Sequence, residues 1–277
     1  MTRKQPKLVP PRGACDTHLH FYDPGVPCAP GTFPPGSFPV EQYQVVQKRL
    51  GLERAIVVQP NAYTDDNRLT LDAIRKFGKN AKGVGVVKPG VKDAELDRLT
   101  QGGICAIRIA TLRGGMLGFD VMDELMARVH PFGWHANIQL DGRELPKVEA
   151  QIKQLPGKFV FDHTGKFLEP VPPQHEAFKS LLRLVDTGRC WVKLSAPYET
   201  SKTGAPKYSD VGQLAKALVK HAPERMLWAS NWPHRSAPKP TPPDDGDLLD
   251  LLLDWAPDDA IRKKILVDNP AELYGFR

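Results

Sequence analysis

Short apolar runs alternate with amphipathic segments along the whole chain. A continuous apolar run of about four to eight residues is typical of a strand buried on both faces, whereas apolar residues three and four apart are typical of a helix. Their alternation indicates βαβ units with parallel strands. The predicted strands cover residues 14–21, 54–60, 82–87, 104–109, 135–140, 159–162, 190–194 and 225–230. The predicted helices cover residues 40–50, 66–77, 93–100, 119–129, 144–155, 175–187, 211–221, 248–255 and 258–267.

Eight predicted strands in this alternation are the number that a closed (β/α)8 barrel requires, and a length of 277 residues suits one such domain. An open doubly wound sheet would carry a glycine-rich phosphate turn after its first strand, whereas this chain has Asp-Thr-His-Leu-His at positions 16–20. No internal repeat or linker divides the sequence. We therefore expect an α/β fold in which a single TIM-like barrel domain spans residues 1–277.

Residues 23–39, after the first predicted strand, are rich in proline and glycine. Both residue types interrupt regular structure, so the segment is predicted to be a long loop between strand and helix. Long loops in compact domains commonly act as lids or binding loops, but an irregular surface segment fits the pattern equally well.

Composition and charge narrow the function classes. The formal net charge of +6 indicates either a solvated basic surface or attraction of an anionic substrate. No basic and aromatic stripe or nucleic-acid motif is present, so no nucleic-acid partner is expected. No apolar run approaches the roughly 18 residues of a membrane span, and the charged N-terminus lacks the apolar core of a secretion signal. We therefore expect a cytoplasmic protein without membrane contact, and the sequence leaves its oligomeric state open.

The four cysteines, Cys15, Cys28, Cys105 and Cys190, contain no C-x-x-C pair. Three of them lie within apolar runs that are predicted to be strands, where a thiol behaves as a small buried hydrophobic group. The pattern predicts free structural thiols and favours neither a zinc site nor a disulfide framework.

Three histidines stand where predicted strands end. Side chains two residues apart in a strand point to the same side, so His18 and His20 share one face of the first strand. His163 follows the sixth strand. A single histidine at such a place is more often structural, but three at the strand ends of a barrel indicate a reactive site, because barrel enzymes place their chemistry there. The rings suit metal binding or acid–base chemistry.

Arginines and smaller polar groups follow other strands. Arg108 lies between two isoleucines at the end of the fourth strand, where burial would require an anion, either a protein carboxylate or the substrate. Arg113 follows in the next loop, either as a second substrate contact or as a surface cation. The remaining polar groups suit a small, oxygen-rich ligand, and they are Gln59, Asn61, Tyr63, Gln139, Ser195, Tyr198, Asn231 and His234.

Three of these strand-end motifs resemble a known family. Cys-Asp-Thr-His-Leu-His at positions 15–20, Phe-Asp-His-Thr-Gly-Lys at 161–166 and Asn-Trp-Pro-His at 231–234 resemble the amidohydrolase-2 branch of the amidohydrolase superfamily. The similarity runs over nearly the whole chain. Within that branch the sequence is most similar to the lactone-processing enzymes, the 2-pyrone-4,6-dicarboxylate lactonases and the D-galactarolactone isomerases. The resemblance implies a barrel enzyme that acts on a lactone.

The resemblance also bears on metal binding. Metal-dependent relatives add to the H-x-H pair a lysine or glutamate on the fourth strand, histidines on the fifth and sixth, and an aspartate on the eighth. This chain keeps three histidines, but it has Arg108, Gln139 and Asn231 at the ends of the fourth, fifth and eighth strands. A catalytic divalent site needs a carboxylate or a full set of imidazoles, and a guanidinium repels a cation. Like the lactone-processing relatives, the chain is expected to use no metal and no other cofactor.

Asn231 stands where the two lactone-processing patterns differ. The lactonase pattern has an aspartate there that activates water, and an amide cannot take up that proton. The isomerase pattern carries Asn-Trp-Pro-His and lets a substrate hydroxyl attack the carbonyl, but a histidine is not expected in it at the position of His18. Hydrolysis and isomerisation therefore both stay open.

The resulting hypothesis is acyl transfer on a lactone of a small dicarboxylic or sugar acid, with an anionic small molecule as the partner. The H-x-H pair and Arg108 would polarise the carbonyl, and His163 would transfer the proton, because its ordinary pKa of ~6.5 suits both directions. Arg108 and Arg113 would bind a carboxylate, and Asn231 would orient the attacking oxygen. Two alternatives are a hydrolase or decarboxylase with zinc on the three histidines, and a non-catalytic binding barrel that lost its base.

Overall fold

The computed structural model describes residues 4–29, 32, 36–112, 114–237 and 242–276. Its eight strands form one parallel sheet, in which each strand lies beside its neighbour in the sequence. The strands are β1 (Cys15–Leu19), β2 (Arg54–Val58), β3 (Ala81–Gly85), β4 (Ile104–Ala110), β5 (His135–Gln139), β6 (Phe159–Phe161), β7 (Cys190–Leu194) and β8 (Met226–Trp228).

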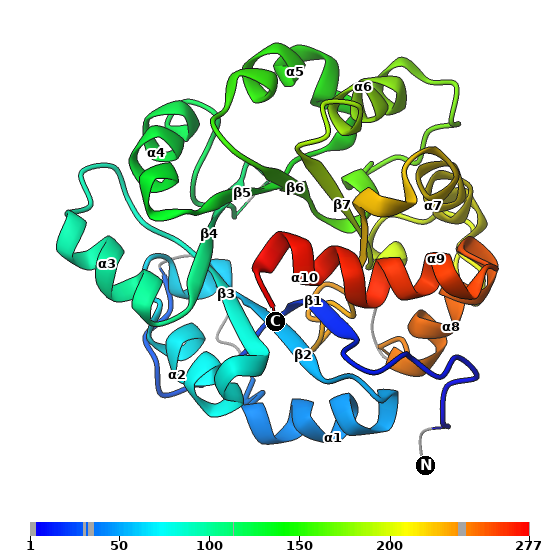
Figure 1. Cartoon of the computed structure of the whole chain (residues 1–277), viewed down its shortest axis with the longest axis horizontal. Helices are drawn as coiled ribbons and strands as arrows, with labels where there is room; N and C mark the ends of the chain where they lie inside the picture. Colours follow the sequence, from blue (N-terminus) through cyan, green and yellow to red (C-terminus); the bar gives the residue numbers. More distant parts are fainter. Residues whose placement is uncertain (1–3, 30–31, 33–35, 113, 238–241, 277) are drawn as a thin grey trace.

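Helices follow the strands in alternation and surround them (Figure 1). Their inward faces carry leucine, valine and aromatic side chains that pack on the outer faces of the strands in one large core. The helices are α1 (Val40–Leu50), α2 (Arg68–Phe77), α3 (Asp93–Gln101), α4 (Met122–Val129), α5 (Leu145–Gln154), α6 (Glu176–Val185), α7 (Ser209–His221), α8 (Asp245–Trp255), α9 (Asp259–Lys263) and α10 (Asn269–Tyr274).

The segment after β8 returns to β1 and closes the sheet on itself. Leu19 and Trp232 form a parallel bridge, the Asn231 amide donates to the His18 carbonyl over 2.9 Å, and the His20 amide donates to the Trp232 carbonyl over 2.9 Å. The sequence order of the strands and this closure confirm the predicted (β/α)8 barrel.

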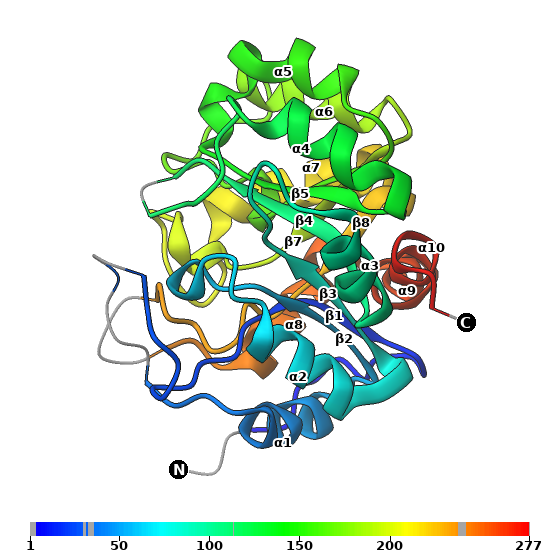
Figure 2. The same ribbon diagram turned by 90° about the vertical axis from the view of Figure 1, so that its left-hand side faces the viewer.

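The C-terminal helices cover the end of the barrel where the strands begin. Figure 1 shows α9 and α10 lying across this end, and Figure 2 shows them on the side opposite to the long loops. Leu273, Tyr274 and Phe276 pack there on apolar side chains of the barrel interior, among them Cys15 and Trp191. This end is therefore closed by hydrophobic packing, and the opposite end is left for the loops that follow the strands.

The predicted and observed elements differ mainly at their ends. The helix predicted for 66–77 begins at Arg68, and the side chain of the preceding Asn67 forms no capping hydrogen bond. The last helix was predicted to end at 267, but a π-helical turn (Lys264–Asp268) leads directly into α10. Pro270 is compatible with this continuation, because proline fits within the first turn of a helix.

The cysteines, the long loop and the lengths of the helices bear on three further expectations. All four cysteines are free, and Cys15 and Cys190 are fully buried in β1 and β7. The predicted loop over 23–39 begins and ends in a short antiparallel bridge between Tyr22 and Phe38. Within the described part of the chain, no helix has both the length and the apolar character that a bilayer span needs.

Candidate active site

A small pocket opens at the carboxyl ends of the strands. Its volume is about 220 Å³. A larger groove of about 760 Å³ runs between α2 and α3 on the outside of the barrel, but the histidines of the strand ends do not line it. We therefore take the smaller pocket as the candidate site. Its walls are formed by His20, Tyr22, Asn61, Ala62, Arg108, Gln139, His163, Lys166, Glu199, Asn231, Arg235 and Ser236.

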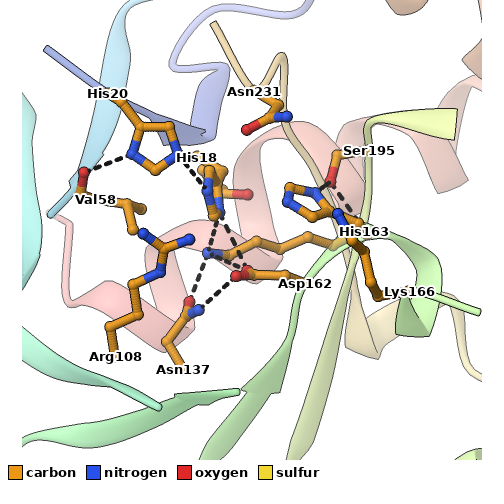
Figure 3. A network of polar contacts seen from close by, with 12 residues as sticks. His18, His20, Val58, Arg108, Asn137, Asp162, His163, Lys166, Ser195 and Asn231 are labelled. Carbon is orange, nitrogen blue, oxygen red and sulfur yellow. Dashed lines mark hydrogen bonds and ion pairs between the residues drawn. The ribbon is translucent and has the colours of Figure 1, made fainter. Parts of the chain in front are cut away.

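The two histidines after β1 are linked to each other. His20 lines the pocket, and His18 stands behind it with no exposed surface. Their Nε2 atoms lie 3.1 Å apart, and Nδ1 of His20 lies 2.7 Å from the Val58 carbonyl (Figure 3). Burial lowers the pKa of His18 to about 4, and it also lowers the pKa of His20. Both rings are therefore neutral near pH 7.

The partners of the two rings restrict where their hydrogens lie. A carbonyl only accepts, so Nδ1 of His20 carries a hydrogen and its Nε2 is an acceptor. Nδ1 of His18 faces two groups with opposite demands, because Oδ1 of Asp162 lies 3.1 Å from it and only accepts, whereas the Lys193 ammonium lies 3.2 Å from it and only donates. The ring of His20 is thus connected through His18 to a buried ion pair.

Lys193 of β7 is the centre of a buried polar cluster beneath the pocket. Its Nζ lies 2.6 Å from Oδ1 of Asn137 and 3.0 Å from Oδ1 of Asp162, in addition to the contact with His18. All four side chains are almost completely buried. Burial alone would raise the pKa of the Asp162 carboxyl, but the neighbouring His18 and Lys193 lower it well below its usual value. This set of His18, Asn137, Asp162 and Lys193 is called the buried polar cluster below.

His163 forms the opposite wall of the pocket. Its ring centre lies 4.9 Å from that of His18, and its Nδ1 lies 2.9 Å from Oγ of Ser195. Figure 3 shows the other edge of the ring turned toward the space between His18 and Asn231. The backbone of His163 is left-handed, with φ of 54°, which bends the chain over the strand end. Burial and the charge of Lys166 lower its pKa, so the ring is neutral near pH 7.

Arg108 brings a positive charge to the pocket. Its Nη1 donates to the Gln59 carbonyl over 2.7 Å, and its buried Nε has no hydrogen-bond partner. The sequence indicated that this residue would need an anion. The negative charge of Asp162 stabilises the charged form of the guanidinium. Arg108 is 6% exposed and lines the pocket, so its positive charge lies next to a ligand bound there.

The predicted residues divide into two groups. The pocket brings together His20, His163 and Asn231 with Asn61, Arg108 and Gln139, while His18 and Ser195 stand directly behind the two histidines. Arg113 lies outside the described residues.

The remaining predicted residues serve the scaffold or the neighbours of the pocket. Gln59 uses its amide inside the turn before α2, where it donates to two backbone carbonyls and accepts from Thr70. The polar atoms of its side chain are thus already paired, and Gln59 is not among the residues that line the pocket. The Tyr63 hydroxyl is bonded to the backbone of Asp23 and so holds the loop after β1. Tyr198 and His234 bond to each other, and Tyr198 also accepts from Asn231 in the pocket wall, but neither is among the residues that line the pocket.

Several residues of the site were not predicted. Lys166 and Glu199 form an ion pair at the pocket wall, and Arg235 stacks on Tyr22 at its rim. Asp162 and Lys193 belong to the buried polar cluster. A charged residue inside an apolar strand, such as Lys193 between Val192 and Leu194, is the signal that could have identified this cluster, because such a residue is seldom buried without a partner.

Comparison with known proteins places this geometry in a family. The chain is 36% identical over 268 residues to D-galactarolactone isomerase from Agrobacterium fabrum, covering 95% of this chain and 91% of that protein. It is 34% identical over 285 residues to 2-pyrone-4,6-dicarboxylate hydrolase from Comamonas testosteroni, covering 98% and 92%. An apo crystal structure from Agrobacterium tumefaciens superposes with a TM-score of 0.92 at 35% identity, covering 98% of this chain and 99% of that chain.

The family model described as amidohydrolase matches residues 15–276, which include every strand of the barrel and every residue that lines the pocket. The two relatives are also similar to this chain over almost their full length. The chain belongs to the amidohydrolase family.

Proposed function

We propose that this protein catalyses acyl transfer on a lactone of a small dicarboxylic or sugar acid, either to water or to another hydroxyl of the substrate. The observation that carries the proposal is the convergence of two neutral imidazoles, a guanidinium and the Asn231 amide around one small pocket. The relatives named as a galactarolactone isomerase and a pyrone dicarboxylate hydrolase support a lactone as the substrate.

In this proposal His163 moves the proton. Its neutral ring takes the hydrogen of the attacking hydroxyl or water, and the oxygen bonds to the lactone carbonyl carbon. When the tetrahedral intermediate collapses, the ring C–O bond breaks and the protonated His163 returns the hydrogen to the leaving oxygen. With water the product is the open hydroxy acid, and with a substrate hydroxyl it is a lactone of another ring size.

Arg108 supplies the positive charge where the oxyanion develops. Its position in the pocket wall allows the guanidinium to form a charge-assisted hydrogen bond to the carbonyl oxygen. His20 stands beside this position, and His18 supports it from behind through the contact between the two Nε2 atoms. Asn231 orients the attacking oxygen, since an amide forms hydrogen bonds but does not take up the proton.

The donor set does not suit a divalent cation. Among the described residues, His18, Asp162 and His163 are the group whose ligand atoms come within 4.8 Å of one another. The Lys193 ammonium already contacts both His18 and Asp162, and no water can screen it because the cluster is buried. A divalent ion there would be repelled at close range by this ammonium and by Arg108. The proposed reaction therefore uses no metal.

The cationic pocket favours an anionic substrate. Arg108, Lys166 and Arg235 all line it, whereas Glu199 is the one carboxylate among the lining residues that the structure describes. Together with the net charge of +6, this supports a lactone that carries a carboxylate. We further propose a cytoplasmic location, which the four free thiols support.

Product analysis by NMR tests the proposal. The protein is incubated with pyrone dicarboxylate and with aldarolactones, and a ring-opened acid would indicate hydrolysis whereas a shifted ring would indicate isomerisation. Thermal stabilisation by these compounds without turnover would instead support a binding barrel. Activity that disappears after chelator treatment and returns with zinc would contradict the metal-free mechanism.

A further inference from the structure

A chain of hydrogen bonds connects the loop after β8 to the start of α8. Asp245 Oδ1 lies 2.7 Å from Nε2 of His234, and Nδ1 of His234 lies 3.0 Å from the Tyr198 hydroxyl. The same hydroxyl lies 2.9 Å from Nδ2 of Asn231, the residue in the pocket wall. All four residues are buried, so no solvent competes for these bonds.

The two ends of this hydrogen-bond chain have a defined direction. A carboxylate only accepts, so Nε2 of His234 donates to Asp245, and Nδ1 of His234 faces the Tyr198 hydroxyl. The Tyr198 oxygen accepts from Nδ2 of Asn231. This last link holds the nitrogen end of the Asn231 side-chain amide toward Tyr198.

A second bond fixes the same orientation. The other hydrogen on Nδ2 of Asn231 is donated to the Glu199 carboxylate over 3.0 Å, and a carboxylate cannot exchange roles with it. Both hydrogens of the amide are thus committed, one to Tyr198 and the other to Glu199. Figure 3 shows the amide oxygen of Asn231 turned toward the side where His18 and His20 lie.

The backbone allows little other adjustment. Asn231 and His234 both have left-handed backbones, with φ of 59° and 60°. The backbone N–H of Asn231 donates to the His18 carbonyl. His234 is further held because Asp245 lies at the first turn of α8 and also faces Arg49 over 3.6 Å. The orientation of the Asn231 side chain is therefore decided by Glu199 in the pocket wall and by Tyr198 behind it.

We propose that Asp245, His234 and Tyr198 are positioning residues, which hold the Asn231 amide with its oxygen toward the pocket so that Asn231 acts on substrate as a hydrogen-bond acceptor. The inference rests on the proposed function for its catalytic consequence. An acceptor at this place binds the hydrogen of the attacking hydroxyl and turns an oxygen lone pair toward the carbonyl carbon. A reversed amide would present two hydrogens to the same lone pairs and block the attack.

The first test removes one hydroxyl. Tyr198→Phe should lower kcat about tenfold with KM nearly unchanged, since the loss of one hydrogen bond frees the amide without removing a substrate contact. Tyr208→Phe is the matched control. Tyr208 is also a buried tyrosine of the β7–α7 region, but it takes no part in the hydrogen-bond chain from Asp245 to Asn231. Equal effects of the two substitutions would overturn the proposal.

A conservative variant provides the rescue. Asp245→Asn retains an oxygen that can accept from His234, so it should keep kcat within about threefold of wild type, whereas Asp245→Leu should match Tyr198→Phe. On an Asn231→Ala background, Tyr198→Phe should have no further effect on kcat, because its action passes through Asn231. The same tenfold loss in both backgrounds would show that Tyr198 acts in another way.

A readout without substrate separates this inference from the proposed function. In ¹H–¹⁵N spectra, the side-chain amide hydrogens of Asn231 should exchange slowly in wild type, Tyr208→Phe and Asp245→Asn, and about tenfold or more faster in Tyr198→Phe and Asp245→Leu. Unchanged exchange in the last two variants would overturn the positioning role, even if no lactone is turned over. Altered exchange in a protein inactive on every lactone would support it and count against the proposed reaction alone.

Discussion

The two ends of this barrel are built from the same strands with opposite chemistry. In β6 and the residue after it, Val160 belongs to the apolar cluster at one end, and Asp162, two residues further along, belongs to the buried polar cluster. In β7, Trp191 and Lys193 show the same change over the same spacing. Residues two apart share a face, so each strand passes from scaffold to site within about 7 Å of its length.

The difference shows how the fold separates stability from reactivity. At the end where the strands begin, α10 covers the interior with Leu273, Tyr274 and Phe276. At the other end, buried charges are tolerated because each has a partner of opposite charge or a polar neighbour. Substitutions at the two ends should therefore fail in different ways, and the following predictions run from the largest expected effect to the smallest.

Lys193→Met should have the largest effect. It removes the ammonium and leaves the Asp162 carboxylate buried without its cation, which should lower the free energy of unfolding by about 3–5 kcal/mol. Urea unfolding followed by fluorescence would measure this loss. The double variant Lys193→Met with Asp162→Asn should recover most of the stability, and a single variant as stable as wild type would contradict the account of the buried polar cluster.

His163→Asn should separate activity from stability at the same end. The substitution keeps a polar side chain beside Ser195 but removes the proton carrier, so kcat should fall by about 10²-fold or more. The unfolding midpoint should change much less than for Lys193→Met. Unchanged turnover on a lactone that the wild type converts would show that another group moves the proton.

Leu273→Ala, at the end of the barrel that α10 covers, should lower stability without lowering activity. Removal of a buried side chain from α10 should cost about 2 kcal/mol of unfolding free energy, with kcat on the folded protein unchanged. Steady-state rates well below the unfolding temperature and a denaturant titration would measure the two quantities. A change in kcat that matched the loss of stability would mean that the ends are coupled.

His135→Leu should make the free energy of unfolding less dependent on pH. Burial, with smaller contributions from Lys193 and Lys158, lowers the pKa of His135 to about 3, below the value of ~6.5 expected when the chain is unfolded. As pH falls below 6.5, the unfolded chain takes up a proton that the folded chain refuses, so stability decreases down to about pH 3. Between pH 7 and pH 5 the variant should lose about 1–2 kcal/mol less than wild type. Equal losses, measured by urea unfolding at both pH values, would mean that His135 does not contribute.

Much of the fold follows from local pattern. Apolar runs of strand length recur between amphipathic segments, and every predicted strand lies at or within a few residues of an observed one. The C-terminal helix α10 was not predicted. It packs against the barrel end, and a contact between residues so far apart in the sequence is not visible in the local pattern.

The site was predictable in kind but less so in detail. His20, His163 and Asn231 follow strand ends, and parallel strands bring such ends together, so their meeting required no knowledge of side-chain contacts. The role of Gln59 could not be read in this way, because its amide is used by a turn whose geometry depends on residues 64–70. The partnership of Asp162 with Lys193 also depends on register between β6 and β7, which pattern alone does not set.

The seam between the first and the last strand has a consequence for how activity appears during folding. His18 and His20 stand on one side of the seam and Asn231 on the other, and backbone bonds between the two segments hold them in register. A chain that has assembled only its first seven strands lacks one wall of the pocket. Turnover should thus arise last, after the most sequence-distant pairing has formed, which makes catalytic activity a direct report on completion of the ring.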